Sequence, residues 1–306
     1  MTNTTVAPVV AGVDGSADAQ LAVDLAAWEA DRRHATLRLV YGFRPVYVCG
    51  VATIGYDLDR QVRDLDNMLI TESARVSRRY PDLPVATEVV QGAPASVLLD
   101  ESAAAQLVVV GSRGRGGFAS LLLGSVSAQV AAYAASPVIV MRPPSRGGTT
   151  GGGDTARGAR DIPGSGPVVL GIDGSTGSAA AVEFAFDEAA ARGTGLIAVY
   201  PWGTMPYDAD ADDPRVEQHT ADTKLADALA AWQEKYPEVP VSHRAIHSLV
   251  PVHTILDESA GAGLIVVGPR GRGGFAGLLL GSVGDGLVRH APAPGAVVHT
   301  RTTTAS

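Results

Sequence analysis

The sequence Gly111-Ser-Arg-Gly-Arg-Gly-Gly-Phe-Ala-Ser-Leu-Leu-Leu-Gly-Ser125 occurs again, almost letter for letter, from Gly268 to Ser282. Each copy follows a short apolar run, leads into a helix-like segment and has the spacing Gly-x2-Gly-x9-Gly-Ser. A glycine-rich turn between a buried strand and a helix is a place where backbone N–H groups converge on an anion. The repeated stretch therefore predicts a phosphate cradle that is used twice.

The small residues of this stretch have specific expected roles. We expect Gly114 and Gly271 to take positive φ and to let the backbone approach a ligand closely. Ser125 and Ser282 stand at predicted helix starts, where a hydroxyl caps N–H groups or contacts a phosphate. The predicted cradle comprises Gly111, Gly114, Gly124, Ser125 and Val126 in the first copy and Gly268, Gly271, Gly281, Ser282 and Val283 in the second.

Arginines in the same stretch have two interpretations. Arg113 and Arg115 in the first copy, and Arg270 and Arg272 in the second, are suited to pair with phosphate groups. Arginines in an exposed loop are as often simply solvated. We include Arg113 among the predicted nucleotide ligands and leave the roles of the other three open.

Composition limits the class of protein. A chain of 306 residues, 46% of them hydrophobic, is long enough for two domains of ordinary size, each with its own core. A net charge of -8 argues against a nucleic-acid partner, which would need clustered Lys and Arg. Only 5% of the residues are aromatic, so a stacking platform for single-stranded nucleic acid is also disfavoured.

The N-terminal residues and the single cysteine, Cys49, bear on the compartment. One cysteine excludes an intramolecular disulfide and fits a reducing environment. Residues 1–7 are polar without a basic region, and no apolar run approaches the length of a membrane span. We expect a soluble, cytoplasmic protein without a membrane partner.

Strand-like and helix-like segments alternate along the first half. Apolar runs predict strands at 8–13, 37–43, 85–90, 107–110 and 138–141, and helical periodicity predicts helices at 17–34, 57–80, 94–104 and 125–135, with a variable loop at 49–56. This order predicts an α/β fold, an open five-stranded parallel sheet of Rossmann-like type with helices on both faces.

The second half repeats the order. Strands are expected at 168–172, 195–200, 241–245, 264–267 and within 291–299, and helices at 179–192, 216–236 and 252–260. Two prolines precede the last strand, so its pairing is left open. We predict two copies of one domain, at 1–143 and 167–302, joined by a flexible linker at 144–166 that is rich in Gly, Pro and Arg.

Two aspartates end the first strand of each half in matching Asp-Gly-Ser turns. Asp14 and Asp173 are expected at the carboxyl ends of the strands, where open parallel sheets bind their ligands. Alternatively, each aspartate is the N-cap of the following helix, and the two roles are compatible.

The paired turns and loops resemble those of the universal stress protein family, in particular its tandem-domain, ATP-binding branch in actinobacteria, whose domains are similar to adenine nucleotide alpha hydrolases. The resemblance implies ATP as the ligand and places Asp14 and Asp173 beside the nucleotide and its ribose or a Mg²⁺ ion. It also implies that backbone groups at Gly42 and Pro201 hold the adenine. Because Pro201 and Pro269 lack an N–H, the second site departs from this pattern.

The resemblance favours an ATP-dependent regulator or sensor of the stress response, working as a homodimer of tandem chains with a regulatory protein partner. An alternative is a slow Mg-dependent ATPase or phosphotransfer enzyme, in which Asp14 holds the metal. The loops have no P-loop lysine and no evident general base, so we assign no catalytic residue. A dinucleotide or flavin binder is disfavoured because Gly-x-Gly-x-x-Gly does not follow the first strand.

Two other groups of polar residues resemble ligand sets only superficially. His243 and His247 can share a face, but no Cys or acidic pair accompanies them at metal-ligand spacing. The acidic segment at 208–213 lacks the regular spacing of a calcium loop, and we expect it to be a solvated surface.

Overall fold

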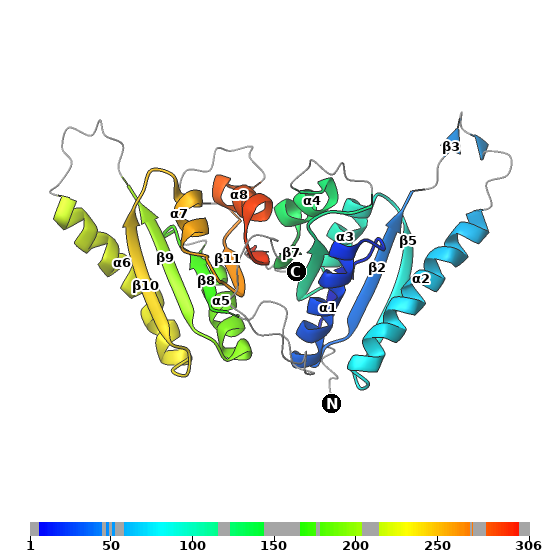
Figure 1. Cartoon of the computed structure of the whole chain (residues 1–306), viewed down its shortest axis with the longest axis horizontal. Helices are drawn as coiled ribbons and strands as arrows, with labels where there is room; N and C mark the ends of the chain where they lie inside the picture. The colour runs from blue at the N-terminus through cyan, green and yellow to red at the C-terminus, as the bar shows by residue number, and fades with distance from the viewer. Residues whose placement is uncertain are drawn as a thin grey trace, which may run out of the picture. The chain divides into compact units, whose positions relative to one another are not determined.

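The computed structural model divides into two compact units, residues 1–141 and 142–306 (Figure 1). It describes residues 6–44, 47–48, 51–52, 58–115, 123–143, 166–175, 178–203, 214–269, 271 and 280–299. Several predictions lie outside these ranges, namely the linker at 144–166 except for its last residue, the acidic segment at 208–213, Cys49, Arg270 and Arg272.

The first unit is built on a parallel sheet. Its strands are β1 (Val9–Gly12), β2 (Leu37–Phe43), β5 (Val85–Gln91), β6 (Leu107–Gly111) and β7 (Val138–Met141), in the spatial order β5-β2-β1-β6-β7. Because the chain moves outward from β1 to β2 and β5 and then returns to β6 and β7, the order reverses beside β1. This confirms the predicted open parallel sheet.

Helices cover both faces of that sheet. They are α1 (Ala17–Arg32), α2 (Leu58–Arg79), α3 (Pro94–Ser102) and α4 (Ser125–Tyr133). Right-handed crossovers put α1 and α2 on one face, and put α3 and α4, which contact each other, on the opposite face. Pro94 at the first position of α3 has the fixed φ that a helix start requires.

The second unit has the same topology. Its strands, β8 (Val168–Gly171), β9 (Leu196–Trp202), β10 (Val241–His247), β11 (Leu264–Val267) and β12 (Gly295–Val297), are parallel and ordered β10-β9-β8-β11-β12. Its helices are α5 (Ala179–Arg192), α6 (Pro214–Lys235), α7 (Pro251–Asp257) and α8 (Ser282–His290). β12 pairs with β11 as β7 pairs with β6, so the prolines before it do not alter the pairing.

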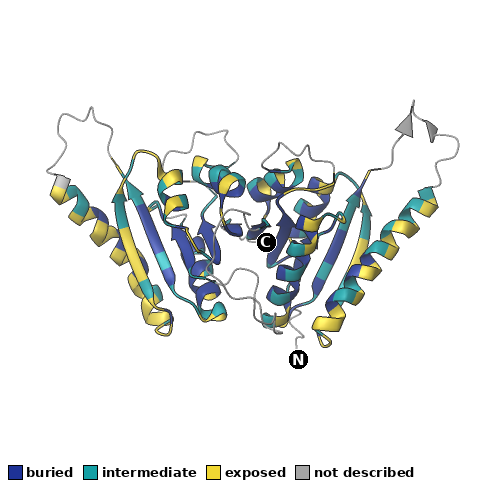
Figure 2. Ribbon diagram, viewed as in Figure 1, coloured by how far each residue is buried: buried dark blue, intermediate teal, exposed yellow. Residues whose placement is uncertain are grey.

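The core of each unit lies between the central strands and the helices, as the dark blue strands in Figure 2 show. Ala22, Ala26 and Ala30 form a fully buried stripe on α1, where their small side chains allow close approach to the sheet. α2 and α6 keep much of their surface exposed. Within the described ranges no helix combines the length and the apolar character needed to cross a membrane.

One predicted loop is partly wrong. Within residues 49–56, the segment β4 (Val51–Ala52) pairs antiparallel with β3 (Tyr47–Val48) as a short hairpin. Two short apolar pairs separated by two residues are compatible with a hairpin, and the prediction overlooked it because each strand is so short.

Candidate functional site

The carboxyl edge of the first sheet brings the predicted site residues together. β1 and β6 are adjacent parallel strands, paired from Val9 and Leu107 onward, so their carboxyl ends lie side by side. Asp14 follows β1, and the glycine loop follows β6. The topology therefore places an acidic turn against a glycine loop that is about one hundred residues later in the chain.

Asp14 joins these two segments through both of its carboxylate oxygens. Oδ1 accepts a hydrogen bond from the backbone N–H of Ser16 at 2.9 Å, and Oδ2 accepts one from the backbone N–H of Arg115 at 2.9 Å. Gly15 between them has φ 77, a conformation that favours glycine. Asp14 thus links the turn after β1 to the glycine loop after β6.

The alternative of Asp14 as a helix N-cap is wrong. Ser16 is the N-cap of α1, and its hydroxyl oxygen accepts from the backbone N–H of Ala19 at 3.2 Å. The same hydroxyl donates to the carbonyl oxygen of Arg113 at 3.3 Å, a second bond to the glycine loop. The Asp14 side chain is directed to the loop because the left-handed Gly15 turns the chain before the helix begins.

Gly114 is a glycine for a different reason from the one expected. Its φ does not lie in the left-handed region, so the predicted positive φ is wrong. A Cβ on Gly114 would instead lie 2.3 Å from Oδ2 of Asp14, closer than any real contact. In the second unit a Cβ on Gly271 would lie 3.3 Å from Oδ2 of Asp173. The aspartate, rather than backbone strain, opposes a side chain at Gly114, because the Asp14 carboxylate would have to move to admit one.

Ser125 begins α4 without capping it. The N-cap is Gly124, which makes no side-chain capping bond, and its N–H donates to the carbonyl oxygen of Ser112 at 2.7 Å. Ser125 is therefore exposed at the first helical position, with half-buried Val126 behind it. The predicted capping role is wrong, while contact with a phosphate stays a prediction.

The second unit repeats this helix start. Gly281 is the N-cap of α8, makes no side-chain capping bond, and donates to the carbonyl oxygen of Pro269 at 2.9 Å. Ser282 is exposed and Val283 half-buried, as in the first unit. In both units the first N–H groups of the helix have no side-chain cap within the described residues, and such groups bind anions.

Asp18 is the residue that sequence reasoning missed. It lies in the first turn of α1, only 7% exposed, and its Oδ2 accepts from the hydroxyl of Ser112 at 2.8 Å and from the backbone N–H of Arg113 at 3.1 Å. The Arg113 guanidinium lies 3.5 Å from the same oxygen. Arg113 is thus not simply solvated, since its side chain pairs with a buried carboxylate, and its contact with a phosphate stays a prediction.

In the second unit, Asp173 forms its hydrogen bonds within its own Asp-Gly-Ser turn. Oδ1 of Asp173 accepts from both the backbone N–H and the hydroxyl of Ser175, at 3.0 and 2.8 Å. Oδ2 of Asp173 is buried and has no hydrogen-bond partner among the residues that the structure describes. The residue four positions after Asp173 is Gly177, and Pro269 stands where the first unit has Ser112.

The two predicted adenine positions lie near the carboxyl ends of their second strands. Gly42 pairs with Val90 in β5, and a Cβ there would lie 2.7 Å from Cα of Pro94, so α3 packs directly on the Gly42 backbone. Pro201 pairs with Ile246 and precedes Trp202 in β9. These positions are at the expected edge of each sheet, and their contact with a ligand stays a prediction.

The described residues contain no group of three or more His, Cys, Asp or Glu side chains that is suited to hold a metal ion. His247 packs edge-on against Trp202, with 4.8 Å between the ring centroids.

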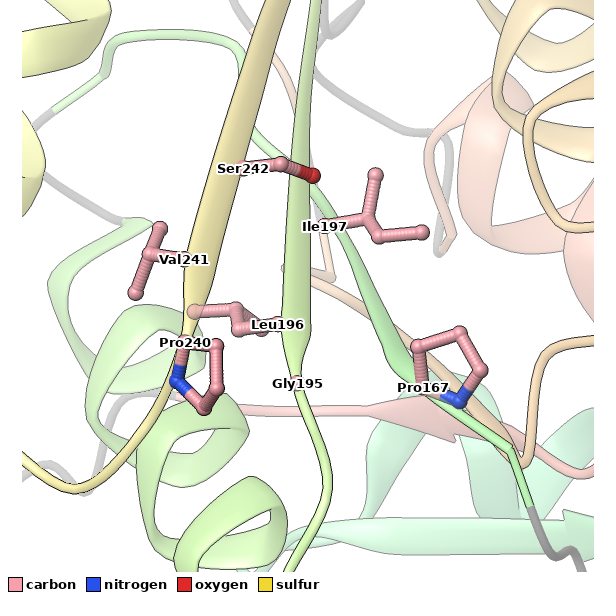
Figure 3. A pocket seen from close by; sticks show the side chains of 7 residues that line it. All are labelled: Pro167, Gly195, Leu196, Ile197, Pro240, Val241 and Ser242. Atoms are coloured by element: carbon pink, nitrogen blue, oxygen red, sulfur yellow. The ribbon is translucent and has the colours of Figure 1, made fainter.

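A shallow pocket in the second unit lies at the opposite edge of the sheet. It is lined at the amino ends of β8, β9 and β10 by Pro167, Gly195, Leu196, Ile197, Pro240, Val241 and Ser242 (Figure 3). None of the predicted site residues is among them. Ligands of open parallel sheets bind at the carboxyl ends, so this apolar pocket is separate from the candidate site.

Comparison with known proteins gives one family. The model of the universal stress protein family matches residues 6–142 and again residues 165–299. A universal stress protein of Mycolicibacterium smegmatis is 37% identical over 301 residues, covering 96% of this chain and 97% of that protein. One from Mycobacterium tuberculosis H37Rv is 34% identical and covers 94% of both.

The fold is also similar to a solved structure. The crystal structure of a universal stress protein from Archaeoglobus fulgidus superposes with a TM-score of 0.67 at 18% identity, covering 96% of this chain and 98% of that one. At this identity the similarity concerns the fold alone.

Proposed function

The chain belongs to the universal stress protein family, and from this premise we propose that each of its units binds ATP at the carboxyl edge of its sheet and that occupancy regulates a partner. The observation that supports this most is the bond from the Arg115 N–H to Asp14, which holds the glycine loop beside the β1 end. The uncapped start of α4 follows the same loop and supplies N–H groups and the positive end of a helix dipole.

The proposed ligands follow the geometry. The α4 start, from Ser125 to Ser127, faces the triphosphate with its N–H groups, and the Ser125 hydroxyl adds a donor. Asp14 shapes the loop and lies beside the ribose or a Mg²⁺ ion. Backbone groups at Gly42 bind the adenine. Residues with the same roles in the second unit are Gly268, Gly271, Gly281, Ser282, Val283 and Asp173, with Pro201 at the adenine position.

A regulator fits these residues better than a catalyst. Both oxygens of Asp14 accept hydrogen bonds from backbone N–H groups, which suits a bracing role and leaves no assigned base for activating water. We propose domains at 1–143 and 167–302 joined by the linker at 144–166, a homodimer of such chains, and a cytoplasmic regulatory partner. Sedimentation of the purified chain with and without ATP tests the dimer.

Glutamate substitutions at the helix starts test ATP binding. A carboxylate at the first helical position complements the helix dipole, so Ser125→Glu and Ser282→Glu keep the helices stable while repelling a phosphate. We expect each substitution to remove one of two ATP equivalents in calorimetric titration, and the double variant to bind none. Ser77→Glu on the exposed face of α2 is the matched control and retains both.

Full ATP binding by the double Ser125→Glu, Ser282→Glu variant would show that the helix starts do not hold the phosphates, and would refute the proposal. Rapid steady turnover of ATP by the wild type, lost in Asp14→Ala, would replace the regulator by an ATPase.

A further inference from the structure

We propose that Asp18 is a positioning residue for the phosphate-binding loop of the first unit, and that the second unit lacks this device, so that the two sites bind ATP unequally. The proposal rests on the ATP binding proposed above and adds a residue outside the repeated glycine stretch. It concerns how the loop is held before a nucleotide arrives.

Asp18 is attached to the part of the loop nearest β6. One carboxylate oxygen accepts from the Ser112 hydroxyl and the Arg113 N–H, and the Arg113 guanidinium approaches the same atom. A Cβ on Gly111 would lie 2.7 Å from the carbonyl carbon of Asp18, so the loop begins in direct contact with the α1 backbone. Because α1 is packed on the sheet, these bonds tie the loop to a rigid element.

The Asp18 carboxylate is almost completely buried, so breaking its hydrogen bonds is costly. Asp18 is 7% exposed and Ser112 is 1% exposed. A buried carboxylate keeps its charge only when donors surround it, and removing one partner leaves a costly unsatisfied group. Ser112 and Arg113 are therefore held where Asp18 puts them.

The second unit lacks two of these groups, the carboxylate of Asp18 and the hydroxyl of Ser112. In the sequence, Gly177 stands where the first unit has Asp18 and offers no side-chain acceptor, and Pro269 stands where it has Ser112 and has neither hydroxyl nor N–H. Replacement of only one partner would leave a buried polar group without its bond, whereas replacement of both is compatible with a stable core. The absence of both groups from the second unit is what we expect if Asp18 and Ser112 act as one unit.

A loop held in its binding conformation costs less ordering when the ligand binds, so the first site should have the higher affinity. The effect concerns only the loop that contacts phosphates. It should therefore change affinity for ATP and leave affinity for adenosine, which has no phosphate, unchanged.

The test uses the full chain with the second site blocked by Ser282→Glu. In this background we expect Asp18→Ala to weaken ATP binding about tenfold, the equivalent of one lost charge-assisted hydrogen bond. Adenosine affinity, measured by competition, should be unchanged. Asp18→Asn retains an acceptor for the Ser112 hydroxyl, so its ATP affinity should lie between those of the Ser282→Glu parent and of Asp18→Ala. An intermediate affinity would show that the effect of Asp18→Ala is not simply misfolding. Asp31→Ala, exposed at the other end of α1, is the control.

Introducing the same pair of residues into the second unit should give the second site the same loop-positioning contact. With the first site blocked by Ser125→Glu, the double variant Gly177→Asp, Pro269→Ser should bind ATP more tightly than its parent. The proposed role of Asp18 would be overturned if Asp18→Ala weakened ATP and adenosine binding equally, or left the ratio of the two affinities unchanged. Absence of ATP binding by the Ser282→Glu chain itself would instead refute the proposed function.

Discussion

Oδ2 of Asp14 accepts a hydrogen bond from the backbone N–H of Arg115 at 2.9 Å, across a sequence separation of 101 residues. The bond links the turn after β1 to the loop after β6, and the space between them is too small for a side chain on Gly114. This part of the candidate site in the first unit therefore depends on contacts among the backbone, the Asp14 carboxylate and Gly114.

Gly114→Ala should damage the first site severely. The new methyl group would lie 2.3 Å from Oδ2 of Asp14, so the loop and the carboxylate must separate. We expect ATP affinity at the first site, measured with Ser282→Glu present, to fall by more than tenfold. Gly271→Ala is the matched comparison, because its methyl group would lie 3.3 Å from Asp173 and needs only a small shift. Equal effects of the two alanines would contradict the steric explanation.

Gly42→Ala should act mainly on stability. Its methyl group would meet Cα of Pro94 at 2.7 Å, and a backbone atom at the start of a helix cannot rotate away. We expect a loss of about 1–3 kcal/mol in the free energy of unfolding, the usual cost of overpacking, measured by denaturant titration. A variant as stable as the wild type would show that α3 moves freely on β2.

Glu29→Gln should destabilise the first unit. Glu29 is fully buried and forms ion pairs with Arg32 and Arg33, so the amide would leave cationic groups poorly compensated. We expect a loss of about 3 kcal/mol in the free energy of unfolding. Glu183→Gln, in an exposed pair, is the control and should change nothing measurable. Equal stability of the Glu29→Gln variant and wild type would show that the arginines find other partners.

The stability of the chain should fall above about pH 10, the ordinary pKa of tyrosine. Burial raises the pKa of Tyr80 and of Tyr236, and a hydrogen bond to Asp187 adds to the effect at Tyr236. Each tyrosine then ionises more readily in the unfolded chain, so its contribution is complete below pH 10 and is lost as pH rises through the folded-state pKa.

Phenylalanine substitutions identify the groups responsible. The double variant Tyr80→Phe, Tyr236→Phe should show a shallower decline of the unfolding free energy between pH 9 and pH 11 than the wild type, as measured by urea titration at several pH values. An identical alkaline slope in both proteins would mean that other groups control it.

The fold was predictable because its signals are local. Buried apolar strands, such as 264–267, and alanine-rich helices, such as 179–192, have the bounds expected from apolar periodicity alone. The repetition of the glycine stretch gave the duplicated architecture. The hairpin at Tyr47–Ala52 was overlooked because two-residue strands have almost no periodicity.

The candidate site was less predictable because its contacts are not local. Asp14 and Gly114 were identified as site residues from their types, but their mutual contact depends on strand order. Asp18 has no local signature, since an acidic residue in a first helical turn ordinarily suits the helix dipole. Aligning the two halves and noting that Asp18 and Ser112 change together would have found it.

The glycine at the N-cap of α4 has a consequence for how the protein responds to its ligand. With glycine at the N-cap, the helix gives up roughly a few tenths of a kcal/mol of the stability that serine or aspartate would provide. An anion bound at that end supplies the missing acceptors, so part of the binding free energy stabilises the helix itself. Slower amide hydrogen exchange along Ser125–Tyr133 on ligand addition would then report occupancy some distance from the phosphates, and would give a partner protein a surface whose rigidity depends on the nucleotide.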